Sequence, residues 1–181
     1  MKAAQKWILT GERGAGKTSL CRLLAAQARE NGWDAAGVIS PAIFDNGQKT
    51  GILAVDLRGG ESRPLACAIA GGRFALPLGK WYFDRTSLEW GEQVIANSPP
   101  CDLLIVDELG PLELLQQDGW QAALAVLRGG NYHLALVVIR PELLEAARGV
   151  IDFSNTLVID HSRSSDHWLR LYWPKIQTIP G

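Results

Sequence analysis

The stretch TGERGAGKTSLCRLL, residues 10–24, places three glycines and a lysine between a short apolar run and an apparent helix. Residues 11–18 match the pattern G-x-x-x-x-G-K-[ST], which indicates phosphate binding only where a strand precedes it and a helix follows. The apolar residues 7–9 predict the strand, and leucines at helical spacing before Asn31-Gly32 predict the helix. The stretch therefore predicts a phosphate-binding loop (P-loop) near the start of an α/β fold.

The chemistry of such a loop explains its residue types. Glycines allow several backbone N–H groups to turn toward phosphate oxygens at a helix N-terminus, whose dipole also favours negative charge. Lys17 is expected to reach the β- and γ-phosphates of a nucleotide, and the Thr18 hydroxyl to bind Mg²⁺. The alternative is a glycine-rich turn without a ligand. The residues expected to bind the nucleotide are Gly11, Glu12, Arg13, Gly14, Ala15, Gly16, Lys17, Thr18 and Ser19.

A second motif, CDLLIVDELGPLEL at residues 101–114, ends a buried-looking strand with two adjacent carboxylates. The carboxyl ends of parallel strands line the ligand crevice of an α/β sheet, so Asp107 is expected beside the P-loop as a Mg²⁺ residue. Glu108 follows it, where a general base can orient and deprotonate a water that attacks a γ-phosphate. The alternative is that both carboxylates only cap the helix that begins near Pro111. Glu113 is expected to be first-turn charge of that helix.

The 181 residues, 47 % apolar and 20 % charged, have the composition of a globular protein, so residues 1–181 are expected to form a single domain. Strand and helix patterns alternate along the chain, with five main strands. Turn signals and short apolar runs interrupt them and predict a small antiparallel meander inserted at about residues 41–70. The remaining predicted elements are strands at residues 36–40, 103–106, 134–139 and 156–160 and helices at residues 87–96, 111–127, 141–147 and 164–176.

Composition argues against several classes of function. A net charge of -1 gives no basic footprint, so nucleic acid is not an expected partner. The three cysteines are widely spaced and the three histidines lack metal-ligand spacing, so neither a disulfide framework nor a zinc site is expected. No apolar run approaches the ~20 residues needed to span a bilayer, and the first ten residues do not resemble a signal peptide. We expect a soluble, cytoplasmic protein without a membrane partner, and a protein partner stays open.

Three cations outside the P-loop are candidates for contact with phosphate. Arg140 follows a main strand, where it is expected either to stabilise charge on the γ-phosphate or to pair with Glu142 or Glu145. Lys80 and Arg85 flank an aromatic cluster, where a solvated face is the expected role and a second phosphate cation the alternative. The seven tryptophans are expected mainly in the core, whereas two or three exposed together would indicate a partner surface.

Together these motifs resemble the small nucleoside-triphosphatase family of RecA-like P-loop proteins, the group that includes the cancer-related nucleoside triphosphatase. The resemblance covers most of the chain and rests on GERGAGKTSL, GVIS leading to TGILAVDL, LGKWYFD, LLIVDELGPLEL and LALVVI. It implies a three-layer RecA-like α/β fold with a mainly parallel five-stranded sheet core and a small antiparallel hairpin or meander extension. It also implies Mg²⁺-dependent hydrolysis of nucleoside triphosphates with loose base choice.

The chain departs from the usual pattern of that family at three places. Arg13 stands where proline is often found, and Ser40-Pro41 follow the second strand in place of acidic residues. Arg163 alone stands where an Asn-Arg pair is found near the last helix. These departures concern base contacts and regulatory contacts rather than phosphate binding.

The sequence therefore predicts a nucleoside triphosphatase that acts on ATP, GTP or another triphosphate. Glu108, Lys17 and Arg140 are its expected catalytic residues, and Thr18 and Asp107 are expected to hold Mg²⁺. One alternative is a nucleotide-dependent switch that binds a partner and hydrolyses slowly. A second, with less support, is a nucleotide or small-molecule kinase.

Overall fold

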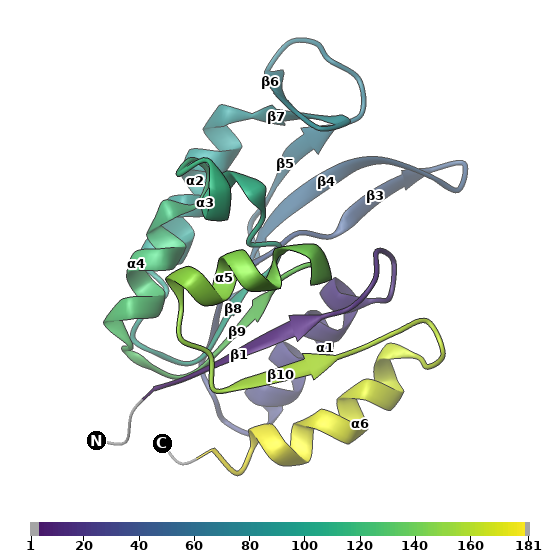
Figure 1. The fold of residues 1–181 in the computed structure, drawn as a ribbon. Helices are drawn as coiled ribbons and strands as arrows, with labels where there is room; N and C mark the ends of the chain where they lie inside the picture. The colour runs from purple at the N-terminus through teal and green to yellow at the C-terminus, as the bar shows by residue number, and fades with distance from the viewer. Residues whose placement is uncertain (1–3, 180–181) are drawn as a thin grey trace.

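A mixed sheet of ten strands lies at the centre of the structure, a computed structural model that describes residues 4–179 (Figure 1). Five of the ten strands are parallel to one another and lie in the spatial order β10, β1, β9, β8, β2. The order confirms the predicted α/β class, because parallel strands need crossover connections. These strands are β1 (Gln5–Thr10), β2 (Ala35–Ile39), β8 (Cys101–Val106), β9 (Tyr132–Val138) and β10 (Asn155–Val158).

The antiparallel part of the sheet continues from β2 and is larger than predicted. β4 pairs antiparallel with β2, β5, β7 and β6 follow in that order, and β3 pairs with β4. The prediction of a five-stranded core with a small insertion at residues 41–70 was therefore wrong in extent, since the antiparallel strands run to Asp84. Pro77 and the flanking glycines weaken the strand pattern of β6, which the sequence did not reveal. The strands are β3 (Ala42–Asp45), β4 (Gln48–Asp56), β5 (Ser62–Cys67), β6 (Phe74–Leu78) and β7 (Trp81–Asp84).

Helices cover both faces of the parallel strands and make three layers (Figure 1). The first and last helices, α1 and α6, pack together on one face, and α2, α4 and α5 cover the other. The helix predicted at residues 141–147 begins as a 3₁₀ turn and runs on to Val150. The helices are α1 (Lys17–Glu30), α2 (Arg85–Ala96), α3 (Pro111–Leu115), α4 (Gln121–Gly129), α5 (Leu144–Val150) and α6 (Ser165–Ile176), with the 3₁₀ turn at Pro141–Leu143.

Strand β8 explains why the parallel strands read as continuous apolar runs. Its Leu103 and Ile105 pack in the core under α1 and α6, whereas Leu104 and Val106 pack in the core under α2 and α4. Successive strand residues point to opposite faces, so a strand covered on both faces needs apolar residues at every position. For this reason the main strands were predicted within two residues of their observed ends.

The helix predicted at residues 111–127 is instead two helices, α3 and α4. α3 ends at Leu115, and Gln117, directly after its C-cap, has a left-handed φ of 54°, a conformation that ends a helix. Gly119, with φ 71°, lies in the link to α4. The Glu113 carboxylate accepts the Gly110 N–H on one oxygen and the Trp120 N–H on the other, each at 2.9 Å. This carboxylate bridges the start of α3 and the residue before α4, so the chain turns sharply between the two helices.

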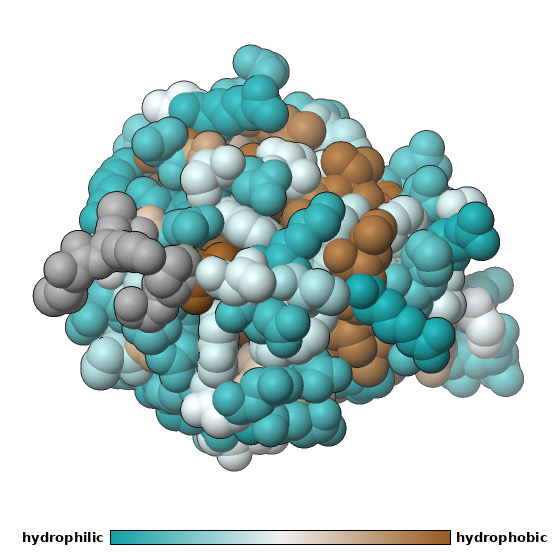
Figure 2. Space-filling view, turned by 90° about the horizontal axis from the view of Figure 1, so that it is seen from below, coloured by the Kyte–Doolittle hydropathy of each residue, from teal (hydrophilic) through white to brown (hydrophobic). Residues whose placement is uncertain are grey.

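None of the helices within residues 4–179 is both long and apolar enough to cross a membrane. Seen from below, the molecule is mainly hydrophilic, with apolar side chains exposed in several places among the hydrophilic ones (Figure 2). Val158 on β10 and Leu171 on α6 are exposed, and these two elements lie side by side in the lower part of Figure 1. All seven tryptophans lie within the described residues, and each is buried or partly buried, so they form no exposed aromatic surface.

Candidate functional site

The glycine-rich loop lies between the carboxyl end of β1 and the start of α1. Gly14 and Gly16 have φ values of 82° and 92°, in the left-handed region that glycine adopts without strain. A Cβ atom at Gly11 would lie 2.1 Å from the backbone oxygen of Ile159, so no larger residue fits there. The three glycines are therefore required by the close approach and the backbone conformation of this turn.

The first turn of α1 has the features of an anion site. Gly16 is its N-cap, and among the described residues no side chain caps the helix and no acidic residue lies in its first turn. The free N–H groups and the helix dipole consequently favour negative charge at the same place. The Lys17 ammonium lies over the loop and donates to the carbonyl oxygens of Gly11, at 2.6 Å, and Glu12, at 2.7 Å. Burial lowers the pKa of Lys17, and the carboxylate of Glu108 opposes this effect most strongly.

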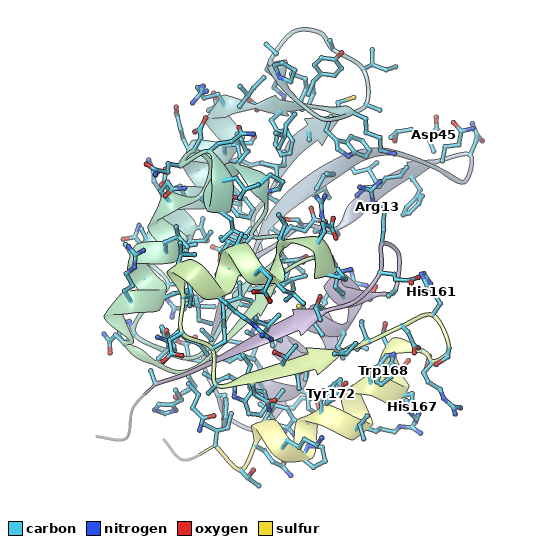
Figure 3. The ribbon with its side chains drawn as sticks, viewed as in Figure 1. Arg13, Asp45, His161, His167, Trp168 and Tyr172 are labelled. Carbon is cyan, nitrogen blue, oxygen red and sulfur yellow. The ribbon has the colours of Figure 1, made fainter. Side chains whose placement is uncertain are left out.

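The loop that connects β10 to α6 lies against the glycine-rich loop. A Cβ atom at Gly14 would meet His161 Cε1 at 3.4 Å, and His161 Nε2 lies 3.9 Å from a Glu12 oxygen. The Arg13 side chain extends in the other direction, from the loop toward the β3–β4 hairpin (Figure 3). Arg163, the cation expected in this region, is exposed. No sequence pattern marks His161, because its approach to the glycine-rich loop depends on how β10 pairs with β1.

Asp107 is fully buried at the carboxyl end of β8. Its Oδ2 atom accepts the Ser40 N–H at 2.9 Å, whereas Oδ1 has no hydrogen-bond partner in the part of the chain described. Burial raises the pKa of Asp107 to about 6, and the charge of Glu108 adds to the effect. The Ser40 N–H, the Thr18 hydroxyl and the Lys17 ammonium lower it. Asp107 thus lies with Thr18 and Lys17, as the two motifs predict, and Ser40 is a neighbour that sequence reasoning missed.

The chemistry of these donors fits Mg²⁺. Mg²⁺ prefers oxygen ligands and usually binds through one or two protein groups, waters and substrate phosphates rather than an all-protein cage. A buried Asp107 oxygen without a partner, near the Thr18 hydroxyl, is suited to such a role. Between residues 4 and 179, no group of three or more histidines, cysteines and carboxylates could hold a metal by itself. The site therefore suits a Mg²⁺ ion that also binds nucleotide phosphates.

Glu108 has a strained backbone. Its φ of 66° is left-handed, which costs a non-glycine residue roughly 1–3 kcal/mol. Hydrogen bonds on either side hold it: the Asp107 N–H donates to the Val38 oxygen at 3.0 Å, and the Leu109 N–H donates to the Val138 oxygen at 3.1 Å. Backbone strain is commonly found where a side chain must be aimed at a ligand.

The alternative role of the two carboxylates as helix caps has no support in the hydrogen bonds. Gly110 is the N-cap of α3, and its N–H is bound by Glu113 rather than by Asp107 or Glu108. Glu113 is buried, and each of its two carboxylate oxygens already accepts a backbone N–H, so a ligand is not required to pair them. Its structural role, which the sequence predicted as helix charge, is a bridge within the chain.

Arg140 follows β9 and lines a small cavity with Glu108. In the described structure no ion pair joins Arg140 to Glu142 or Glu145, the alternative that the sequence left open. The cavity measures about 50 Å³ and also contacts Ser40. Its apolar walls come from Ile52, Leu65, Leu78, Phe83, Leu88 and Leu112.

Three further cations, Lys80, Arg85 and Lys49, lie on or beside the antiparallel strands and differ in their exposure. Arg85 and Lys80 are exposed, as expected of a solvated face. Lys49 on β4 was not identified from the sequence, yet it is only partly exposed and lies 5.1 Å from the centre of the Trp81 ring. No motif marks Lys49, because the antiparallel strands bring it to this place.

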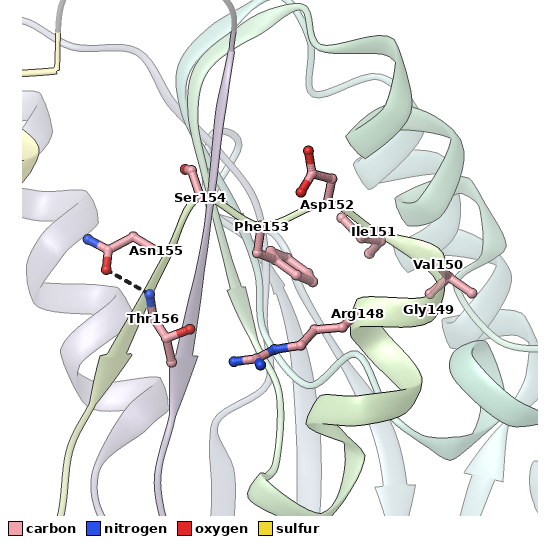
Figure 4. Close-up of a pocket in the computed structure, with 9 residues that line it drawn as sticks. All are labelled: Arg148, Gly149, Val150, Ile151, Asp152, Phe153, Ser154, Asn155 and Thr156. Carbon is pink, nitrogen blue, oxygen red and sulfur yellow. Dashed lines mark hydrogen bonds between the residues drawn. The ribbon is translucent and has the colours of Figure 1, made fainter.

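A larger hollow lies at the opposite edge of the sheet. It measures about 700 Å³ and is lined by residues 148–156, from the end of α5 into β10 (Figure 4). Asn155, which pairs with Trp7, is the first residue of β10, so the hollow lies toward the amino ends of the parallel strands. The glycine-rich loop instead follows the carboxyl end of β1. This hollow contains neither the glycine loop nor the acidic pair, so it is not the candidate site.

Known proteins resemble the chain over most of its length. The model of a family described as NTPase matches residues 6–165. A nucleoside-triphosphatase THEP1 of Saccharolobus solfataricus is 32 % identical over 114 residues, which cover 62 % of this chain and 64 % of that protein, slightly less than two thirds of its length. A THEP1 of Methanopyrus kandleri is 29 % identical over 159 residues, or 82 % of this chain and 87 % of the relative. The solution structure of a human cancer-related nucleoside triphosphatase has the same fold, with a TM-score of 0.70, 23 % identity and coverage of 98 % of this chain and 100 % of that one. The family match spans both motifs of the site, and the chain belongs to the NTPase family.

Proposed function

We propose that this member of the NTPase family hydrolyses nucleoside triphosphates to diphosphates and phosphate, with Mg²⁺, at the glycine-rich loop. Family membership and relatives named nucleoside-triphosphatase support the reaction. The observation on which the mechanism depends is the placement of Lys17, Asp107 and Glu108 around the carboxyl edge of one sheet.

In this proposal the loop binds the phosphates through its backbone. N–H groups of residues 11–19 point at the β- and γ-phosphates, aided by the dipole of α1. The Lys17 ammonium exchanges its two carbonyl contacts, with Gly11 and Glu12, for phosphate oxygens.

Thr18 and Asp107 hold Mg²⁺ in this proposal. The buried, unpartnered Oδ1 of Asp107 supports the assignment, since such an oxygen is costly to leave unpaired. When bound, Mg²⁺ supplies a positive charge that stabilises the charge on the phosphate oxygens.

Glu108 is the proposed general base. Its carboxylate takes a proton from the attacking water as a bond forms between the water oxygen and the γ-phosphorus. The bond from that phosphorus to the bridging oxygen breaks, and the diphosphate leaves with the electron pair. Arg140, on the same side as Glu108, stabilises the negative charge on the γ-phosphoryl oxygens.

We further propose loose base specificity, because every residue in this mechanism acts on phosphate, metal or water. A nucleotide-dependent switch would bind nucleotide with the same loop but hydrolyse it slowly, so the rate of phosphate release distinguishes it from an enzyme.

The test is phosphate release from ATP, GTP, CTP and UTP, with and without Mg²⁺, beside a binding titration for each nucleotide. The proposal predicts release from several nucleotides that requires Mg²⁺. Tight binding without release from any of them would instead indicate a switch or a transferase.

A further inference from the structure

One face of β7 turns toward the candidate site. Because successive strand residues alternate between faces, Trp81 and Phe83 lie on the same face. Phe83 lines the cavity that also contacts Glu108 and Arg140. Phe83 and Trp81 both pack against the hydrophobic core on this face of the sheet. The antiparallel half of the sheet therefore borders the side of the site where Glu108 lies.

Lys49 lies at this border, on β4. Its ammonium nitrogen is 5.1 Å from the centre of the Trp81 ring, within the range of a cation–π interaction. The side chain is only partly exposed, and no ion pair engages it in the part of the chain that the structure describes. A partly buried cation without a paired anion loses hydration that a negatively charged ligand can replace.

The strand geometry connects Lys49 to the site. Ile52 lies three residues along β4 from Lys49, and Phe83 lies two residues after Trp81 on β7. Both line the cavity that contacts Glu108 and Arg140.

The surrounding charges agree with this placement. Burial lowers the pKa of Lys49, and the carboxylate of Glu108 opposes this effect, whereas Arg13, Lys80 and Arg140 lower the pKa further. Arg13 extends from the glycine-rich loop toward the hairpin that carries Lys49 (Figure 3). Arg13 from the loop, Arg140 after β9 and Lys49 from β4 thus lie near the Glu108 carboxylate, an arrangement that favours a polyanionic ligand, whereas Lys80 is exposed to solvent.

We propose that Lys49 is a catalytic cation supplied by the β3–β4 hairpin of the same chain, and that its ammonium contacts the γ-phosphoryl group during hydrolysis. The assignment rests on the proposed function. As the water oxygen bonds to phosphorus and the bridging bond breaks, Lys49 stabilises charge on the γ-phosphoryl oxygens. Its proton stays in place, because the proton of the water goes to Glu108. The antiparallel strands would then be part of the active site rather than an appendage.

Three variants test the assignment. Lys49→Met keeps an apolar stem over Trp81 and removes the charge, and Lys49→Arg restores a cation. Lys80→Met is the matched control, because Lys80 lies 5.2 Å from the same ring but is exposed. Measured are kcat and KM for Mg²⁺-ATP, affinity for ADP, and affinity for ADP with aluminium fluoride, a mimic of the transferring phosphoryl group.

Lys49→Met should lower kcat about 100-fold, the effect of removing one transition-state donor, with KM and ADP affinity changed less than about 3-fold. Lys49→Arg should recover at least a tenth of the wild-type kcat, and Lys80→Met should stay within about 3-fold of it. A wild-type kcat in Lys49→Met, a rise in KM alone, or an equal loss in Lys80→Met would overturn the assignment.

A wild-type protein that releases no phosphate would contradict the proposed function, and the affinities then decide on Lys49 separately. In that case Lys49→Met should lose the extra affinity that aluminium fluoride gives to ADP. Equal gains in wild type and Lys49→Met would overturn the role of Lys49 whatever the activity.

Discussion

The Ser40 N–H donates to Oδ2 of Asp107 at 2.9 Å, which joins the ends of β2 and β8 and fixes the carboxylate by one of its oxygens. The other oxygen, Oδ1, is buried without a partner among the described residues. A carboxylate held in this way presents its free oxygen in one direction, so a metal that it binds needs no rearrangement of the protein. A backbone donor at Ser40, in place of an acidic neighbour, also avoids a third negative charge beside Asp107 and Glu108.

Replacement of Asp107 by Asn should remove the Mg²⁺-dependent part of the nucleotide affinity. The amide oxygen can still accept the Ser40 N–H, so the free energy of unfolding should change by less than about 2 kcal/mol. Titration of ATP with and without Mg²⁺, beside urea unfolding, measures both effects. If Mg²⁺ strengthens binding equally in Asp107→Asn and wild type, Asp107 does not hold the metal.

Lys17→Ala should weaken triphosphate binding at least about 10-fold and abolish phosphate release, because the ammonium faces both the loop and the acidic pair. Arg22→Ala is the control, since Arg22 is an exposed cation on the same helix. Binding titrations and phosphate release should show no change in this control. Equal losses in the two variants would mean that general positive charge, rather than Lys17, is responsible.

Gly11→Ala should lower the free energy of unfolding by more than about 2 kcal/mol, because its Cβ would overlap the Ile159 backbone oxygen and neither backbone can yield cheaply. Gly149→Ala in α5 is the matched change, since nothing lies within 4 Å of its Cβ. It should stabilise the protein by up to about 1 kcal/mol, because alanine favours helix. Denaturant unfolding of both variants checks the contrast, and similar stabilities would contradict it.

Glu113→Ala should destabilise the protein by roughly 2 kcal/mol, because the buried Trp120 N–H and the Gly110 N–H both lose their acceptor. Burial raises the pKa of Glu113 in the folded state. The stability that this shift contributes is therefore present at acid pH and lost as the pH rises through the folded pKa.

The difference in unfolding free energy between wild type and Glu113→Ala should consequently narrow as the pH rises above the ordinary pKa of a glutamate, about 4.3. Glu145→Ala, at an exposed glutamate, should show no such trend. A difference that widens with pH would mean that the hydrogen bonds to the charged carboxylate outweigh its burial.

Features encoded over short distances could be predicted from the sequence. The glycine spacing of residues 11–18, the apolar strand on each side of the site and the Asp107–Glu108 pair are local patterns. The rule that carboxyl ends of parallel strands meet at one edge was then enough to place Asp107 near Thr18. Arg140 was placed near Glu108 by the same rule, although its role stayed open.

Features that depend on contacts between segments far apart in the sequence could not be predicted, because local patterns do not specify those contacts. The turn between α3 and α4 is held by the Glu113 carboxylate, which accepts a backbone N–H seven positions along the chain. Lys49 reaches the site only because β4, β5 and β7 continue the sheet, and His161 because β10 pairs with β1. Neither residue belongs to a motif, so spacing alone gives no reason to single it out.

The most direct test of the account is phosphate release by Glu108→Gln, measured beside wild type with parallel nucleotide binding. Glu89→Gln, at an exposed glutamate on α2, is the control. The account predicts that Glu108→Gln binds the triphosphate within about 3-fold of wild type and loses at least about 100-fold in kcat, because the amide cannot take the proton of the attacking water. Turnover equal to wild type in Glu108→Gln would contradict the assignment of Glu108 as general base.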